Sequence, residues 1–224
     1  AFFVAVWKGF DNFVEELVGQ GIDPCARDLN GSPALFNAAK LGKASVLRHL
    51  LVFGADPNVF SSDRKWTALG SALNVRQGDP MVVLLLAAGA DPNAAGADGA
   101  RPLQSAIHRA YSVLVALLLA AGATVHSVDV EQDYTLRSRL IQCLLAGATG
   151  DPAAFANEEL DAARANIAVA KNQIETARRQ LKADRQALVL KKALPMCIGL
   201  QTLEVPAFVT LAVLDELLPG RLSE

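Results

Sequence analysis

The pentapeptide Gly-Ala-Asp-Pro-Asn occurs twice in this chain of 224 residues, at residues 54–58 and 89–93. Looser copies stand on either side, Gly-Ile-Asp-Pro at residues 21–24 and Gly-Ala-Thr-Val at residues 122–125. The leading glycines, at 21, 54, 89 and 122, are 33, 35 and 33 residues apart. A phrase that returns every 20–50 residues or so is typical of repeat arrays, in which each unit covers its neighbour's apolar face. We therefore expect a solenoid, a fold that binds more often than it catalyses.

One complete unit, residues 28–60, predicts two short helices. Turn-forming residues precede a first helix that opens at Pro33 and ends near Leu41. Gly42 should close this helix, because glycine adopts the left-handed conformation at little cost. A second helix is expected over residues 44–52, whose apolar side chains recur at a spacing of three to four. Gly54 and the Asp-Pro pair after it then turn the chain into a hairpin loop.

This unit resembles the ankyrin repeat. The family pattern begins Asp-x-x-Gly-x-Thr-Pro-Leu-His-x-Ala-Ala and ends Leu-Leu-Leu-x-x-Gly-Ala-Asp-x-Asn. The chain keeps parts of it in phase, as Leu-Phe-Asn-Ala-Ala at residues 35–39, Leu-Leu-Leu-Ala-Ala-Gly-Ala-Asp at 84–91 and Leu-Leu-Leu-Ala-Ala-Gly-Ala at 117–123. The resemblance covers about residues 1–150. It implies an all-α fold, an ankyrin-repeat solenoid of four to five units with a truncated first unit.

The chain also departs from the family pattern. No unit keeps the whole Thr-Pro-Leu-His: the fragments are Pro-Ala-Leu-Phe at residues 33–36, Thr-Ala-Leu-Gly at 67–70 and Arg-Pro-Leu-Gln at 101–104. Because the family uses that Thr and His to tie helix ends to the backbone, we expect less rigid units. The pattern decays after Gly122, and residues 134–147 are expected to form no more than a shortened fifth unit.

The resemblance also implies where a partner would bind. In stacked ankyrin units the second helices form a convex back, whereas the hairpin tips and the exposed sides of the first helices line a concave groove. The family's contact positions fall here on Trp7, Lys8, Leu29, Asn30, Lys40, Arg64, Trp66, Asn74, His108 and Arg109. Beside them lie Ser32, Leu41, Val75, Asp98 and Ala100.

The composition of this surface suggests the chemistry of its partner. Both tryptophans of the chain fall on it, and tryptophan is enriched at interface hot spots. Four basic residues surround them, namely Lys8, Lys40, Arg64 and Arg109. We expect a partner segment of acidic and apolar character. The alternative is that Trp7 covers the N-terminal core, Trp66 packs on its loop and the basic residues are ordinary solvated surface.

Residues 151–194 follow a different pattern, with no helix breaker between Pro152 and Pro195. Large apolar residues recur there every seven positions, at Leu160, Ile167, Ile174, Leu181 and Leu188, with Ala163, Ala170 and Ala177 three positions after the first three. This spacing predicts a long helix with a heptad seam. Beside the seam, a basic ridge recurs at the same interval, at Arg164, Lys171, Arg178 and Arg185.

A helix of this length is expected to meet a second partner. About 42 residues would extend roughly 60 Å at about 1.5 Å per residue, more than the end of the array can cover. We place that contact at Ile167, Ile174, Arg164, Lys171 and Arg178. The alternative is that the helix folds back along the array or onto the tail.

The sequence therefore suggests three parts: an array at residues 1–150, a long helix at 151–194 and a helical tail at 195–224. Pro206 and Pro219 should split the tail into two short apolar helices. Residues 194–214 are about long enough to span a membrane. Because Gln201, Glu204 and Pro206 interrupt this stretch, packed amphipathic helices are expected instead.

Composition and the titratable residues argue against several classes of function. A net charge of −2 gives no field that would attract nucleic acid or acidic lipid. The three cysteines, Cys25, Cys143 and Cys197, lack CxxC spacing and predict buried thiols in a reducing, intracellular compartment. No histidine has a Cys or carboxylate at metal-ligand spacing, and the glycine-rich residues 95–99 lack the Gly-Lys-Ser/Thr of a phosphate loop.

We therefore expect neither an enzyme nor a cofactor nor a bound metal. The predicted function is a protein-binding scaffold or adaptor, or a structural subunit of a larger assembly, with one partner in the groove and a second on the long helix. Two alternatives stay open: the substrate-recognition adaptor of a ubiquitin ligase, suggested by a weak likeness of the tail to F-box helices, and the regulatory domain of a longer enzyme.

Overall fold

The computed structural model describes residues 1–75, 78–97, 99–125, 142, 144–145 and 157–202. The chain divides into two compact units, Ala1–Arg178 and Arg179–Glu224. The first unit contains successive helix pairs: α1 (Phe2–Lys8) and α2 (Asp11–Gly19), α3 (Ala34–Lys40) and α4 (Ala44–Val52), α5 (Ala68–Leu73) and α6 (Asp79–Ala87), α7 (Pro102–His108) and α8 (Ser112–Ala120). A long helix, α11 (Asn157–Thr202), starts in the first unit and ends in the second.

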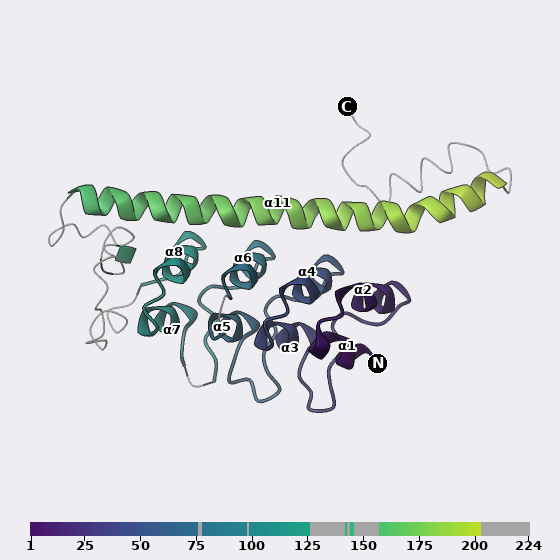
Figure 1. Cartoon of the computed structure of the whole chain (residues 1–224), viewed down its shortest axis with the longest axis horizontal. Helices are drawn as coiled ribbons and strands as arrows, with labels where there is room; N and C mark the ends of the chain where they lie inside the picture. The colour runs from purple at the N-terminus through teal and green to yellow at the C-terminus, as the bar shows by residue number, and fades with distance from the viewer. Residues whose placement is uncertain (76–77, 98, 126–141, 143, 146–156, 203–224) are drawn as a thin grey trace. The chain divides into compact units, whose positions relative to one another are not determined.

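The helix pairs form two layers (Figure 1). The first helices, α1, α3, α5 and α7, lie side by side in one layer, and the second helices, α2, α4, α6 and α8, form the other. The hairpin loops project beyond the layer of first helices. In the described part of the chain, strand-like pairing is limited to two isolated bridges that close hairpins, Arg27 with Pro33 and Phe60 with Thr67. The fold is all-α, as the sequence predicts.

The second repeat matches the sequence prediction closely. Helices α3 and α4 have the expected bounds, and the four apolar residues of α4, Val46, Leu47, Leu50 and Leu51, are buried. Gly42 separates the two helices with a φ of 71°. A Cβ on Gly42 would also lie only 3.0 Å from Cγ1 of Val75, so this turn needs glycine for both conformation and space.

The last residue of the recurring pentapeptide joins consecutive repeats. The Nδ2 of Asn58 donates to the carbonyl of Gly89 at 3.2 Å, and its Oδ1 accepts from the N–H of Asp91 at 2.8 Å. Asn93 repeats this pattern, donating to the carbonyl of Gly122 at 3.2 Å and accepting from the N–H of Thr124 at 2.8 Å. The recurring asparagine therefore stabilises the stacking of the loops, a role that the sequence pattern alone did not reveal.

Replacing Asn93 with Ala should lower the free energy of unfolding by about 1–2 kcal/mol, because its three hydrogen bonds to the next loop, one of them from the hydroxyl of Thr124, are lost. Urea unfolding followed by circular dichroism measures the change. The matched control is Asn30→Ala, at an exposed asparagine on a hairpin tip, which should change the free energy by less than about 0.5 kcal/mol. Equal losses from the two variants would contradict this role for the asparagine.

Two sequence predictions need correction. Cys25 is exposed rather than buried, because it follows Pro24 in the loop between α2 and α3, where its N–H donates to Oδ1 of Asp23 at 2.8 Å. Helix α11 does not end at residue 194 but runs through Pro195 to Thr202. A proline inside a helix costs about 3 kcal/mol and one hydrogen bond, and the 46-residue helix continues past Pro195 despite this cost.

Several predictions fall outside the described residues. They are the groove position Asp98, the shortened fifth unit apart from residues 142 and 144–145, the two tail helices beyond Thr202, and the burial of Cys143 and Cys197. The division into three domains therefore stays a prediction. Among the described helices, none combines the length and the apolar character needed to cross a membrane.

Candidate functional site

The first hairpin tip is held by the carboxylate of Asp28. Its Oδ1 accepts from the N–H groups of Asn30 and Ser32, both at 2.9 Å, and its Oδ2 accepts from Nδ2 of the buried Asn37 at 2.8 Å. Burial acts to raise the pKa of Asp28, but the hydrogen bonds from Asn37, Ser32 and Asn30 and the charge of Lys40 outweigh it and lower the pKa below its ordinary value. This network therefore ties the first hairpin tip to α3 through Asn37.

Stability should therefore depend on the ionisation of Asp28. Because its folded pKa lies below its unfolded pKa, the carboxylate stabilises the fold above the unfolded pKa of about 3.9, and this contribution is lost as the pH falls through the folded pKa. Asp28→Asn should unfold at a lower urea concentration than the parent at pH 7, and the difference between the two unfolding midpoints should shrink towards pH 2.5. A difference that stays constant across this pH range would contradict a stabilising role for the Asp28 carboxylate.

The second hairpin tip fixes the position of Trp66. Ser61 donates its N–H to the carbonyl of Trp66 at 2.8 Å, and its Oγ accepts from the N–H of Trp66 at 3.1 Å while donating to Asp63 at 2.6 Å. One edge of the indole ring, Cε3, lies 3.7 Å from the point where a Cβ on Gly70 would stand. The side chain of Trp66 packs on the start of α5 with 38% of the residue surface still exposed.

Successive tips lie against one another. A Cβ on Gly31 of the first tip would lie 3.6 Å from the Cβ of Ser62 on the second. The carbonyl of Arg64 on the second tip accepts from the N–H of Ala97 on the third at 3.1 Å. Arg64 itself has a φ of 56°, and its guanidinium lies 5.4 Å from the centre of the Phe60 ring, within cation–π range. The three tips therefore form one continuous surface.

The predicted groove residues lie on the exposed surface. Leu29 is fully exposed on the first tip, although leucine is more often buried. The other predicted groove residues exposed there or at the ends of the first helices are Trp7, Lys8, Asn30, Lys40, Arg64, Asn74, His108 and Arg109. Ser32 is an exception: it is buried, and its N–H donates to Oδ1 of Asp28 at 2.9 Å.

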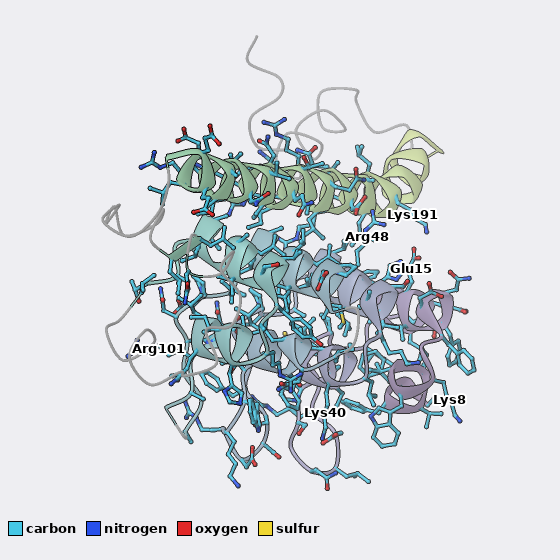
Figure 2. The ribbon with its side chains drawn as sticks, turned by 60° about the vertical axis from the view of Figure 1, so that its left-hand side comes forward. Lys8, Glu15, Lys40, Arg48, Arg101 and Lys191 are labelled. Atoms are coloured by element: carbon cyan, nitrogen blue, oxygen red, sulfur yellow. The ribbon has the colours of Figure 1, made fainter. Side chains whose placement is uncertain are left out.

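Charged residues lie on both layers of helices. Figure 2 shows Lys8 and Lys40 on the layer of first helices, and Glu15 and Arg48 on the layer of second helices. Across the second layer, Oε2 of Glu15 lies 3.5 Å from Nε2 of His49, so this pair joins α2 to α4. Among the described residues, no three His, Cys, Asp or Glu side chains lie close enough together to hold a metal ion.

The residues predicted on the long helix divide into two groups. Ile174 is only 4% exposed and Ile167 is partly buried, so the seam of the first compact unit faces the chain itself. The burial of these two isoleucines agrees with the alternative in which the long helix folds back along the array. Lys171 is exposed, and so are two ridge arginines that pair with acids on their own helix: Arg164 with Asp161 at 3.3 Å, and Arg178 with Glu175 at 2.7 Å.

The chain was compared with known proteins. Residues 2–96 match the family model for ankyrin repeats (3 copies). The chain is 33% identical over 129 residues to an ankyrin repeat-containing protein of Treponema pallidum (strain Nichols), a match that covers 57% of this chain and 43% of that protein. It is also 32% identical over 130 residues to alpha-latroinsectotoxin-Lt1a of Latrodectus tredecimguttatus, covering 57% of this chain and 9% of the toxin. The chain thus spans less than half the length of either relative.

Proposed function

Because residues 2–96 are ankyrin repeats, a protein–protein interaction module, we propose that the chain is a scaffold or adaptor that holds a segment of another protein on its hairpin tips. One observation carries this proposal. Leu29 and Trp66 are exposed on adjacent tips whose backbones are fixed by internal hydrogen bonds. Ankyrin repeats are in general not enzymes, so binding is the activity to test first.

Rigidity makes these apolar side chains effective for binding. A partner that buries Leu29 and Trp66 removes apolar surface from water, at about 25 cal/mol per Å². Because the Asp28 and Ser61 networks already order the two tips, little loop entropy is lost on binding. This combination favours a docking site over a flexible loop that merely tolerates exposed residues.

The charge of the surface indicates the partner's chemistry. Lys8, Lys40, Arg64 and Arg109 are all exposed on the tips or at the ends of the first helices. Complementary charge raises association rates and orients the partner. The best fit is an extended segment that carries carboxylates on either side of apolar residues.

The wider role is also a proposal. A scaffold in a larger assembly would hold a second partner, and the exposed side of α11 with Arg164 and Lys171 is the surface left for it, since Ile174 is buried in the chain itself and Arg178 reaches the carbonyl of Ala87. An intracellular, reducing location remains part of this proposal.

The proposed function is tested by removing the two apolar side chains. The double variant Leu29→Ala, Trp66→Ala should lose the proteins that co-purify with the parent chain while keeping its helical circular dichroism. An unchanged set of co-purified proteins would refute binding at the hairpin tips.

A further inference from the structure

The outer faces of the second helices change character along the array. The residue six places before each loop glycine is Glu15 in α2, Arg48 in α4, Val83 in α6 and Ala116 in α8. The next residue in each helix follows the same order: Glu16, His49, Leu84 and Leu117. Helices α2 and α4 thus have a polar outer face, whereas α6 and α8 are apolar on all sides. A helix that is apolar all round is normally buried on all sides.

The start of α11 supplies the missing cover within the first compact unit, Ala1–Arg178. It lies beside α8 (Figure 1). A crevice of about 200 Å³ is lined by Val113 and Ala116 from α8 and by Val169 and Ala170 from α11. Further along, Nε of Arg178 reaches the carbonyl at the end of α6, that of Ala87, at 3.5 Å. The same stretch of α11 therefore follows the two helices that lack a polar outer face.

The heptad seam explains how the helix fits this surface. Leu160, Ala163, Ala170 and Ile174 are all buried, whereas their neighbours on the helix are mostly exposed. The large residues and the alanines, each recurring every seven positions, present one narrow apolar stripe on this face of the helix.

We propose that the outer face of α6 and α8 is a helix-binding surface, which residues 157–178 occupy as a strap from the same chain. Its ligand class is an amphipathic helix with a Leu/Ile–Ala heptad stripe. The strap covers the apolar outer face of α6 and α8, the second helices of the last two described repeats. Helices α2 and α4 have polar outer faces, so their repeats need no such cover within this unit. This surface lies on the layer opposite the hairpin tips and is independent of the function proposed for them.

The test compares two Ala→Glu variants of the full chain. Ala170 is buried in the seam, and Ala168 is exposed two residues earlier on the same helix. Hydrogen–deuterium exchange read by mass spectrometry should show at least tenfold faster exchange in residues 157–178 of Ala170→Glu, with faster exchange also in α6 and α8, and no change in α1–α4. Binding of the dye ANS should rise several-fold. Ala168→Glu should match the parent in both measurements.

Two results would overturn the proposal. One is identical exchange and dye binding in Ala170→Glu and Ala168→Glu, which would mean that the seam does not hold the helix. The other is an equal rise in exchange across α1–α4, which would make α11 part of one cooperative core. Should Ala170→Glu fail to fold, Ile174→Ala, with the exposed Thr176→Ala as its control, provides the same comparison at smaller amplitude.

Discussion

Replacing Leu85 with Ala is expected to lower the free energy of unfolding by about 2–5 kcal/mol. Leu85 is 0% exposed and lies in α6, which packs against α5 in its own repeat and against α4 and α8 in the neighbouring repeats. Truncating its side chain leaves a cavity in the core beside α6. In a solenoid, where each repeat is stabilised by its neighbours, this loss should weaken first the repeats that contact α6.

The control for this prediction is another leucine, Leu29. Its side chain is fully exposed, so Leu29→Ala should change the free energy of unfolding by less than about 0.5 kcal/mol. Urea unfolding of both variants is monitored by circular dichroism at 222 nm. It compares the same Leu→Ala substitution at a buried and at an exposed position. A loss below 0.5 kcal/mol for Leu85→Ala would mean that α6 is not packed as described.

Trp66→Ala should weaken partner binding by at least about 30-fold, equivalent to the roughly 2 kcal/mol that defines a hot spot. Ser61 holds the backbone of Trp66, and one edge of the indole lies against Gly70 with the outer part exposed, so the side chain enters the interface without losing much rotational freedom. Titration of the co-purified partner by isothermal calorimetry or biolayer interferometry measures the change. Leu29→Ala should weaken binding in the same direction.

An aromatic residue away from the tips provides the control. Phe13 in α2 is exposed to a similar extent as Trp66, so Phe13→Ala removes comparable apolar surface outside the proposed interface. Its affinity for the partner should stay within about twofold of the parent. Equal losses from Phe13→Ala and Trp66→Ala would indicate a general effect on the array rather than a contact at Trp66.

The sequence predicted those features that depend on residue type at regular spacing. The bounds of α3 and α4, the left-handed turn at Gly42 and the burial of Leu47 all follow from apolar periodicity and from the chemistry of glycine. The exposure of Leu29 and Trp66 followed from the phase of the repeat. These are local properties, or properties copied from one repeat to the next.

Some backbone conformations and some contacts between elements were not predicted from the sequence. Arg64 and Ala110 adopt positive φ angles of 56°, which their residue types do not suggest. The bond of Asp28 to Asn37 joins a loop to a helix nine residues later, and no family pattern marks it. The cover on α6 and α8 could have been found, because Val83 and Ala116 break the polar pattern set by Glu15 and Arg48.

The most direct test of binding at the hairpin tips is a photo-crosslinking map. The crosslinking amino acid p-benzoylphenylalanine is placed at residue 29, on the first tip, or at residue 45, which is exposed on α4 in the opposite layer. The proposal predicts a crosslinked partner of defined mass from residue 29, little product from residue 45, and a several-fold loss at residue 29 when Trp66 is also replaced with Ala. Crosslinking from residue 45 as strong as that from residue 29, or product at residue 29 that persists without Trp66, would contradict it.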